Sequence, residues 1–309
     1  MVMLLDLRAV RLANPKSITI SVHTLASTLL RRATNGRATR DNHPGQNRRT
    51  STGTGLVLGI SGMLHYAVGI WPSRDNVWTN SSVAGHGGPE AMPETQVLMA
   101  LLAGGPFGPS DAAGSGNRSL IMRSCRDDGV LLRADKPITM LDSAFAAVPF
   151  EEMPCNTSVP DDLTCAAVNV WATHSDIGHS RFGYILGLDL VKPFEVRPRD
   201  ILPRSEAETE AQQFRVWEYW SGVGGDGEDR TMLADAAQPF AVPAPPLSPN
   251  EAVITSTYHV LAPVLPNGWT YLGEPGKIVA ASSRRVSRIE STAHEVSVCL
   301  LGSRGEEIL

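Results

Sequence analysis

The sequence lacks the features that mark several common protein classes. Its 309 residues carry a net charge of −5, with a pI near 5.9, so no basic excess points to nucleic acid. No C-x-x-C pair occurs among the four cysteines, which argues against the common zinc sites. P-loops, G-x-S-x-G elbows and internal repeats are missing as well. The sequence therefore predicts neither a metal nor a cofactor.

The N-terminal residues 1–16 also lack the basic start and long apolar core of a signal peptide. Three N-x-[ST] triplets, beginning at Asn80, Asn117 and Asn156, have the form of glycosylation acceptors. A polar loop separates Cys155 from Cys165, and these two residues are either a disulfide of a secreted protein or free thiols. We expect a soluble chain, secreted if its true N-terminus lies upstream.

One long uncharged run raises the question of a membrane. Residues 53–71 (GTGLVLGISGMLHYAVGIW) match a bilayer span in length but include five glycines. The composition favours a small-residue helix that packs against a strand and leads into the WPSRD segment. No membrane partner is predicted, and the sequence does not fix the oligomeric state.

The character of the chain changes near residue 146, which predicts two domains. Residues 1–145 alternate strand-like and helix-like runs. One strand is predicted within 17–25, and another over the apolar run LMALLAGG at 98–105. Residues 146–309 contain short β-type runs separated by turn residues, including GWTYLGEPGKIVAAS at 268–282, and they predict an antiparallel β-sandwich. A Pro-rich stretch at 239–249 is expected to be an extended connector.

Two aspartates stand where a parallel sheet would place ligand-binding groups. The FGPSD turn puts Asp111 just past the predicted strand at 98–105, and Asp75 follows the WPSR segment. In parallel α/β folds, ligands are bound at the carboxyl ends of strands. An aspartate after Pro-Ser is also a common turn former, so a purely structural role for Asp111 remains open.

Several motifs in this region occur together and in order. They are WPSRDNVW, then GGPFGPSD, then a helical GNRSLIMRSC, then DDGVLLRADKPITMLDSAF. The combination resembles the end of the barrel in raffinose synthases and seed imbibition proteins, plant members of the melibiase clan of retaining α-galactosidases. The resemblance implies that residues 15–145 are about strands six to eight of a (β/α)8 TIM barrel. It also implies a C-terminal β-sandwich.

The resemblance assigns roles to particular residues. Arg37 and Asp41 have the family spacing, which implies that Asp41 is the general acid/base and that Arg37 binds sugar hydroxyls. Asp75, Trp78 and Asp111 would line the sugar site. A retaining glycosidase needs two carboxylates about 5–5.5 Å apart. The family nucleophile lies on an earlier Lys-x-Asp strand that nothing before residue 37 supplies, so we expect an incomplete and inactive chain.

Two functions from different classes follow. The first is a glycoside hydrolase-like protein that acts on or binds α-galactosyl carbohydrate. The second is a non-catalytic module that binds carbohydrate or another partner. The aromatic cluster Trp217, Tyr219 and Trp220 suits sugar stacking, but core packing is the favoured interpretation, with Trp217 and Tyr219 on one face and Trp220 opposite.

Overall fold

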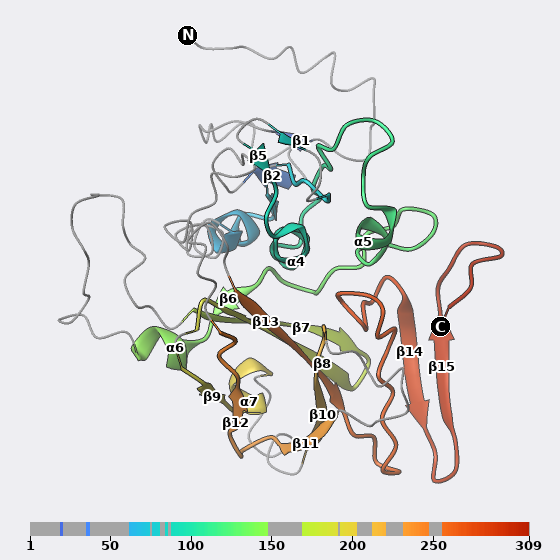
Figure 1. Ribbon diagram of the computed structural model, residues 1–309. Helices are drawn as coiled ribbons and strands as arrows, with labels where there is room; N and C mark the ends of the chain where they lie inside the picture. The colour runs from blue at the N-terminus through green and yellow to red at the C-terminus, as the bar shows by residue number, and fades with distance from the viewer. Residues whose placement is uncertain are drawn as a thin grey trace.

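The computed structural model describes eleven stretches of the chain, drawn in colour in Figure 1. They are residues 19–20, 35–37, 62–74, 76–80, 84–85, 88–147, 169–190, 192–202, 212–220, 231–246 and 255–308. The elements of the N-terminal part are β1 (Thr19–Ile20), β2 (Asn35–Arg37), β3 (Trp71–Ser73), β4 (Ala84–Gly85), β5 (Gly88–Pro89), α4 (Pro93–Leu102) and α5 (Arg118–Met122). The elements that follow are β6 (Thr139–Met140), α6 (Asp142–Ala146), β7 (Val170–Ile177), β8 (Ser180–Leu188), β9 (Phe194–Val196), α7 (Pro198–Ile201), β10 (Gln213–Glu218), β11 (Met232–Asp235), β12 (Phe240–Val242), β13 (Ser256–Pro263), β14 (Val286–Ser291) and β15 (Val296–Leu300).

The N-terminal strands are parallel. β1 pairs with β2 and β2 pairs with β3, in sequence order, and a helical stretch at 62–67 leads into β3 as predicted. A further parallel bridge joins Val77 to Pro109, where the Ser110 N–H donates to the Val77 carbonyl (2.8 Å). Within the described residues these strands form an open sheet, and no closed barrel is seen. None of the described helices is long and apolar enough to cross a membrane.

The predicted strand over 98–105 is wrong, because most of that run belongs to α4. Pro93 occupies the first turn of the helix and Glu94 gives it an acidic start, both of which favour helix initiation. Every residue from Thr95 to Leu102 is buried. A helix that is covered on all sides shows no amphipathic period, so its apolar run cannot be told from a buried strand by pattern alone.

The two glycines that follow α4 allow a close approach to β3. Gly104 has a φ of 86°, and a Cβ added there would lie 2.7 Å from the Trp71 ring. A Cβ on Gly105 would lie 2.2 Å from the Pro72 carbonyl oxygen, which is shorter than any real contact. The Arg133 guanidinium lies 3.5 Å from the centroid of the Trp71 ring and donates to the Gly104 carbonyl (3.2 Å). The GG pair is therefore needed for packing between the helix end and β3.

Most of the described strands are antiparallel, as predicted for the region after residue 146. Its main sheet has the strand order β11-β10-β13-β8-β7-β6. β7 and β8 form a long hairpin, from Val170 opposite Gly187 to Ile177 opposite Ser180. The two strands at the sheet edges, β6 and β11, were not predicted from the sequence. The predicted strand at 268–282 is wrong, since residues 271–285 have no strand structure.

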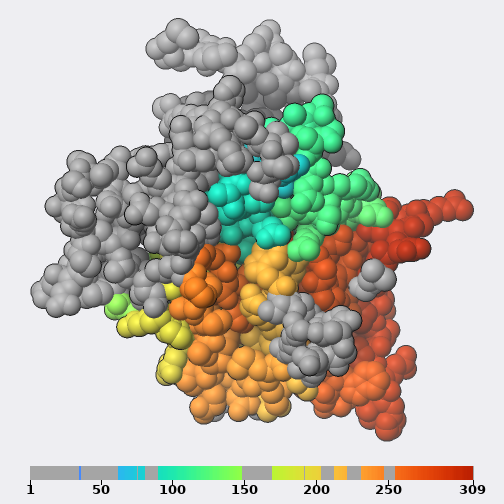
Figure 2. Space-filling view, viewed as in Figure 1, coloured from blue at the N-terminus to red at the C-terminus, as the bar shows by residue number. Residues whose placement is uncertain are grey.

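Both faces of the six-stranded sheet are buried. On one face, large side chains of β7, β8, β10 and β13 share a single core with α4 and with residues 278–281. On the other face, a second core includes residues of α6, α7, β9 and β12. In Figure 1 the helices α4 and α5 lie on one side of the sheet, while α7, β9 and β12 lie on the other. Figure 2 shows the same segments closely packed in the space-filling view.

Three tyrosines from neighbouring strands hold the irregular segment at 274–285 in place. The hydroxyls of Tyr219, Tyr258 and Tyr184 donate to the carbonyls of Gly276, Ile278 and Ala281, at 3.0, 2.7 and 2.9 Å. Burial raises the pKa of Tyr219 to about 12, so its hydroxyl stays protonated and keeps this donor role at neutral pH. This segment is therefore ordered by side chains of the sheet.

Candidate functional site

The edge where β2 and β3 end is the first candidate site. In the parallel register Arg37 is paired with Ser73, so both strands finish side by side. β3 continues into Arg74, which is only 5% exposed and donates from Nη1 to the Gln96 carbonyl of α4 (3.4 Å). The predicted residues Asp41 and Asp75 lie outside the described residues. The structure thus brings the predicted Arg37 to the same edge as the segment that carries Asp75.

Two polar side chains, one just before α4 and one within it, are buried. Glu90 is 1% exposed, and its carboxylate accepts the Met92 N–H (3.1 Å) at the start of α4. Gln96 is fully buried, and neither atom of its side-chain amide bonds to a described residue. A buried amide of this kind costs about 1–3 kcal/mol unless a polar group pairs with it. Ligand pockets are mostly apolar but contain a few buried polar groups of this kind.

Asp111 is hydrogen-bonded to the 76–80 segment that follows β3. Its Oδ1 accepts the backbone N–H of Thr79 (3.0 Å) and of Asn80 (3.1 Å), and its Oδ2 accepts the Thr79 hydroxyl (2.6 Å). The Thr79 hydroxyl in turn accepts the Asn117 N–H (2.8 Å), and Asn117 caps α5 through Leu120 N–H (3.1 Å). The carboxylate of Asp111 thus joins the 76–80 segment to the turn that precedes α5.

Trp78 is 7% exposed and lies between two residues that are completely buried, Val77 and Thr79. Its neighbour Val77 belongs to the core that contains α4. A sugar-stacking aromatic needs an accessible ring face, and Trp78 does not offer a wide one. A role for Trp78 and Asp111 in lining a sugar site stays a prediction.

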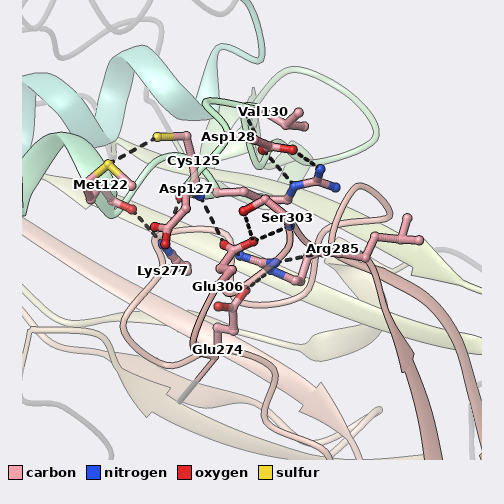
Figure 3. Close-up of polar contacts among 12 residues, drawn as sticks. Met122, Cys125, Asp127, Asp128, Val130, Glu274, Lys277, Arg285, Ser303 and Glu306 are labelled. Atoms are coloured by element: carbon pink, nitrogen blue, oxygen red, sulfur yellow. Dashed lines mark hydrogen bonds and ion pairs between the residues drawn. The ribbon is translucent and has the colours of Figure 1, made fainter.

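A second cluster of charged groups is shown in Figure 3 and was not anticipated from the sequence. The side chain of Arg285 is 1% exposed and is paired with two glutamates, through Nε to Glu274 (2.6 Å) and through Nη2 to Glu306. Its Nη1 donates to the Leu301 carbonyl (2.7 Å). The Glu306 carboxylate also accepts the N–H groups of Asp127 (3.1 Å) and Ser303 (2.9 Å).

The charged groups of this cluster stabilise the fold and do not form a catalytic site. Hydrogen bonding to Arg285 holds the pKa of Glu306 far below its usual range, so the group cannot be a proton donor near neutral pH. The same hydrogen bond raises the pKa of Arg285. Beside it, the Lys277 ammonium donates to the carbonyls of Met122 (2.9 Å) and Cys125 (2.8 Å) at the end of α5. The cluster fixes residues 301–306 onto the loop after α5.

The aromatic cluster of β10 belongs to the core. Trp217 is 2% exposed and Tyr219 is 6% exposed, which confirms the core interpretation for both. Placing Trp220 on the opposite face was wrong, because its ring packs edge-on against Tyr219 with a centroid distance of 4.8 Å. The strand ends at Glu218, so strand alternation no longer applies at Trp220. Arg123 lies over both rings, 6.0 Å from Tyr219 and 5.6 Å from Trp220.

The chain matches no family model and no curated protein. Neither comparison supports the resemblance to the α-galactosidase clan, which stays a prediction.

Among the described residues, no group of three or more histidines, cysteines and carboxylates is arranged to hold a metal ion. Cys125 is buried and Cys299 is partly exposed, and both are free thiols. Cys155 and Cys165, whose pairing the sequence left open, lie outside the described residues.

Proposed function

We propose that this chain is a glycoside hydrolase-like protein, related to α-galactosidases and raffinose synthases, that binds α-galactosyl carbohydrate where β2 and β3 end. The observation that carries the proposal is the parallel register that pairs Arg37 with Ser73. Parallel strands are the architecture expected of a (β/α)8 barrel segment, and ligands are bound at the carboxyl ends of such strands. The buried Gln96, whose backbone carbonyl accepts a hydrogen bond from Arg74 next to this edge, supports the same location.

The proposed roles follow the order of the chain. Arg37 ends β2 and would donate hydrogen bonds to sugar hydroxyls. Asp41 follows four residues later and would be the acid/base, which requires a pKa raised by burial or by an anionic neighbour. Asp75 directly follows Arg74, at the end of β3, and would accept hydrogen bonds from the sugar. Asp111 and Trp78 would support this edge through the 76–80 segment.

We expect binding without turnover. Retention needs a nucleophilic carboxylate and an acid carboxyl group on opposite sides of the glycosidic bond. In the described part of the chain, Glu274 and Glu306 come together, but both are paired with the buried Arg285. Asp111 is bonded to Thr79 and Asn80. None of these three carboxylates is available as a nucleophile.

The test combines binding with activity. Saturation-transfer NMR with raffinose should detect binding by the full chain, with the strongest transfer to the galactosyl protons. Arg37→Ala and Asp41→Asn should each abolish it, whereas the control Arg288→Ala, an exposed cation on β14, should not. Nitrophenol release from an aryl α-galactoside that disappears in Asp41→Asn would show that turnover occurs and that the binding-only proposal is wrong.

A second candidate, a non-catalytic interaction module, is favoured by one observation. Both carboxylate oxygens of Asp111 accept hydrogen bonds from Thr79 and Asn80, which is unusual for a residue that should contact substrate. Absence of saturation transfer from raffinose and from the simpler ligand methyl α-galactoside, with a cooperatively folded protein, would support this candidate over the first.

A further inference from the structure

Among the described strands, none pairs with the outer edge of the β14–β15 hairpin. In the described part of the chain β14 pairs with β15 and with no other strand, and the pair forms a separate two-stranded sheet. Ile289 and Val298 on its inner face pack against the main core. Figure 1 shows β14 between the rest of the protein and β15, which is the outermost strand on that side.

The hydrogen-bonding groups of this edge can be assigned from the register. The Thr292 N–H donates to the Glu295 carbonyl (2.9 Å), so these two residues form a hydrogen-bonded pair at the hairpin turn. Hydrogen-bonded pairs alternate along an antiparallel ladder. The next ones are therefore Glu290 with Ser297 and Arg288 with Cys299. The N–H and C=O groups of Val296, Val298 and Leu300 then point away from β14.

The edge strand β15 itself carries neither charge nor proline, and the irregularity of the hairpin lies in β14, between Val286 and Arg288. The stretch from Val296 to Leu301 reads VSVCLL, with no charge and no proline. Leu300 and Leu301 are each 42% exposed. Natural proteins protect such edges with lysines, prolines, bulges or a covering element, because an unprotected edge recruits another strand.

We propose that β15 pairs antiparallel with β15 of a second copy of this chain, which joins two hairpins into one four-stranded sheet. Charge favours a second copy in this orientation. The exposed Glu295 stands at one end of the uncharged stretch and the exposed Arg304 beyond the other, and neither makes an ion pair among the described residues. An antiparallel copy brings opposite charges to the same end, whereas a parallel copy would bring like charges together.

The symmetry of the pair defines its register. A two-fold axis places one residue opposite itself, and centring the axis on Val298 pairs all five residues of β15. Ser297 of one copy then faces Cys299 of the other across a pair without backbone hydrogen bonds. Two strands of this length bury less than the roughly 1,200 Å² of small stable interfaces. We therefore expect a weak dimer, with a Kd of about 100 μM.

Sedimentation velocity across a concentration series tests the proposal. The full chain should shift from monomer to dimer as its concentration passes about 100 μM. Leu300→Lys should raise the Kd at least about tenfold, because it puts a charge within the paired strand. Leu301→Lys is the matched control, with the same exposure and the same change just outside the paired residues, and should not weaken the dimer. A monomer at every concentration, or a dimer equally strong in Leu300→Lys, would overturn the proposal.

Thiol cross-linking provides a second readout that does not depend on the stability of a lysine variant. Under the thiol oxidant diamide, Ser297→Cys should form a covalent dimer through disulfides between Cys299 of one copy and the introduced thiol of the other. Glu290→Cys, on the same face but one strand inward, is the control and should remain monomeric. Equal cross-linking of the two variants would show that the contact is not at the β15 edge.

Discussion

The charged cluster around Arg285 offers the sharpest test of how the C-terminal segment is held. Glu306→Gln keeps the size of the side chain but replaces one carboxylate oxygen by an NH₂ group. In the protein both oxygens face donors: Oε1 accepts from Arg285 and Asp127, and Oε2 accepts from Ser303 N–H and, at 3.4 Å, from the Ser303 hydroxyl. Either orientation of the glutamine therefore sets a donor against a donor.

The expected loss can be estimated from the contacts. Removing one partner of a buried ion pair costs about 3–5 kcal/mol. Arg285 retains Glu274 and the Leu301 carbonyl, so we place Glu306→Gln at the lower end, about 3 kcal/mol. For a chain of this size that corresponds to a fall in Tm of about 6 °C. Glu307→Gln, at an exposed position next along the chain, should change the stability by less than about 0.5 kcal/mol.

The effect should also depend on pH. Because the pKa of Glu306 is lowered in the folded protein, its contribution is complete above the ordinary glutamate pKa of about 4.3 and is lost as the pH falls below that value. Urea melts at pH 7 and pH 3.5 should show a large difference between wild type and Glu306→Gln at pH 7 and a smaller one at pH 3.5. If Glu306→Gln matches Glu307→Gln at pH 7, the cluster does not stabilise the fold.

Two further predictions concern packing and titration. Gly105→Ala should destabilise the protein by about 3 kcal/mol or prevent folding, because its Cβ would meet the backbone of Pro72, while Gly108→Ala has open space around it and should be nearly neutral in the same thermal melt. Burial lowers the pKa of His259 to about 4, so neutral His259 supports folding above its ordinary pKa of about 6.5, and this support is lost as the pH falls from 6.5 towards 4. His259→Gln should flatten the pH dependence of the Tm over that range, and an unchanged slope would show that His259 does not titrate with unfolding.

The sequence predicted β7 and β8 well because their pattern agrees with their environment. More than half of their residues are β-branched, aromatic or apolar, and the turn at Gly178 separates them. The prediction of a strand over most of α4 was wrong for a physical reason. Because α4 is buried on all sides, its apolar residues do not show the 3.6-residue period that identifies a helix. The prediction for 268–282 failed for another reason: this segment is held by Tyr184 on β8, Tyr258 on β13 and Tyr219 just past β10, and not by strand pairing of its own.

The two candidate sites also differ in how far the sequence could predict them. The family resemblance predicted that Arg37 and the WPSRD segment lie at barrel strand ends, and the structure shows only that β2 and β3 are parallel, with Arg37 paired with Ser73. The Arg285 cluster could not be predicted, because its partners Glu274 and Glu306 are 11 and 21 residues away and meet only through folding. A buried arginine gives no local signal in the sequence.

The most direct test of the proposed function is a crystal structure of the full chain soaked with raffinose. We predict density for the galactosyl ring at the edge where β2 and β3 end, in contact with Arg37 and with the carboxyl group of Asp41. Well-ordered sugar elsewhere on the protein, or an edge in which Arg37 and Asp41 lie on different surfaces, would contradict the account.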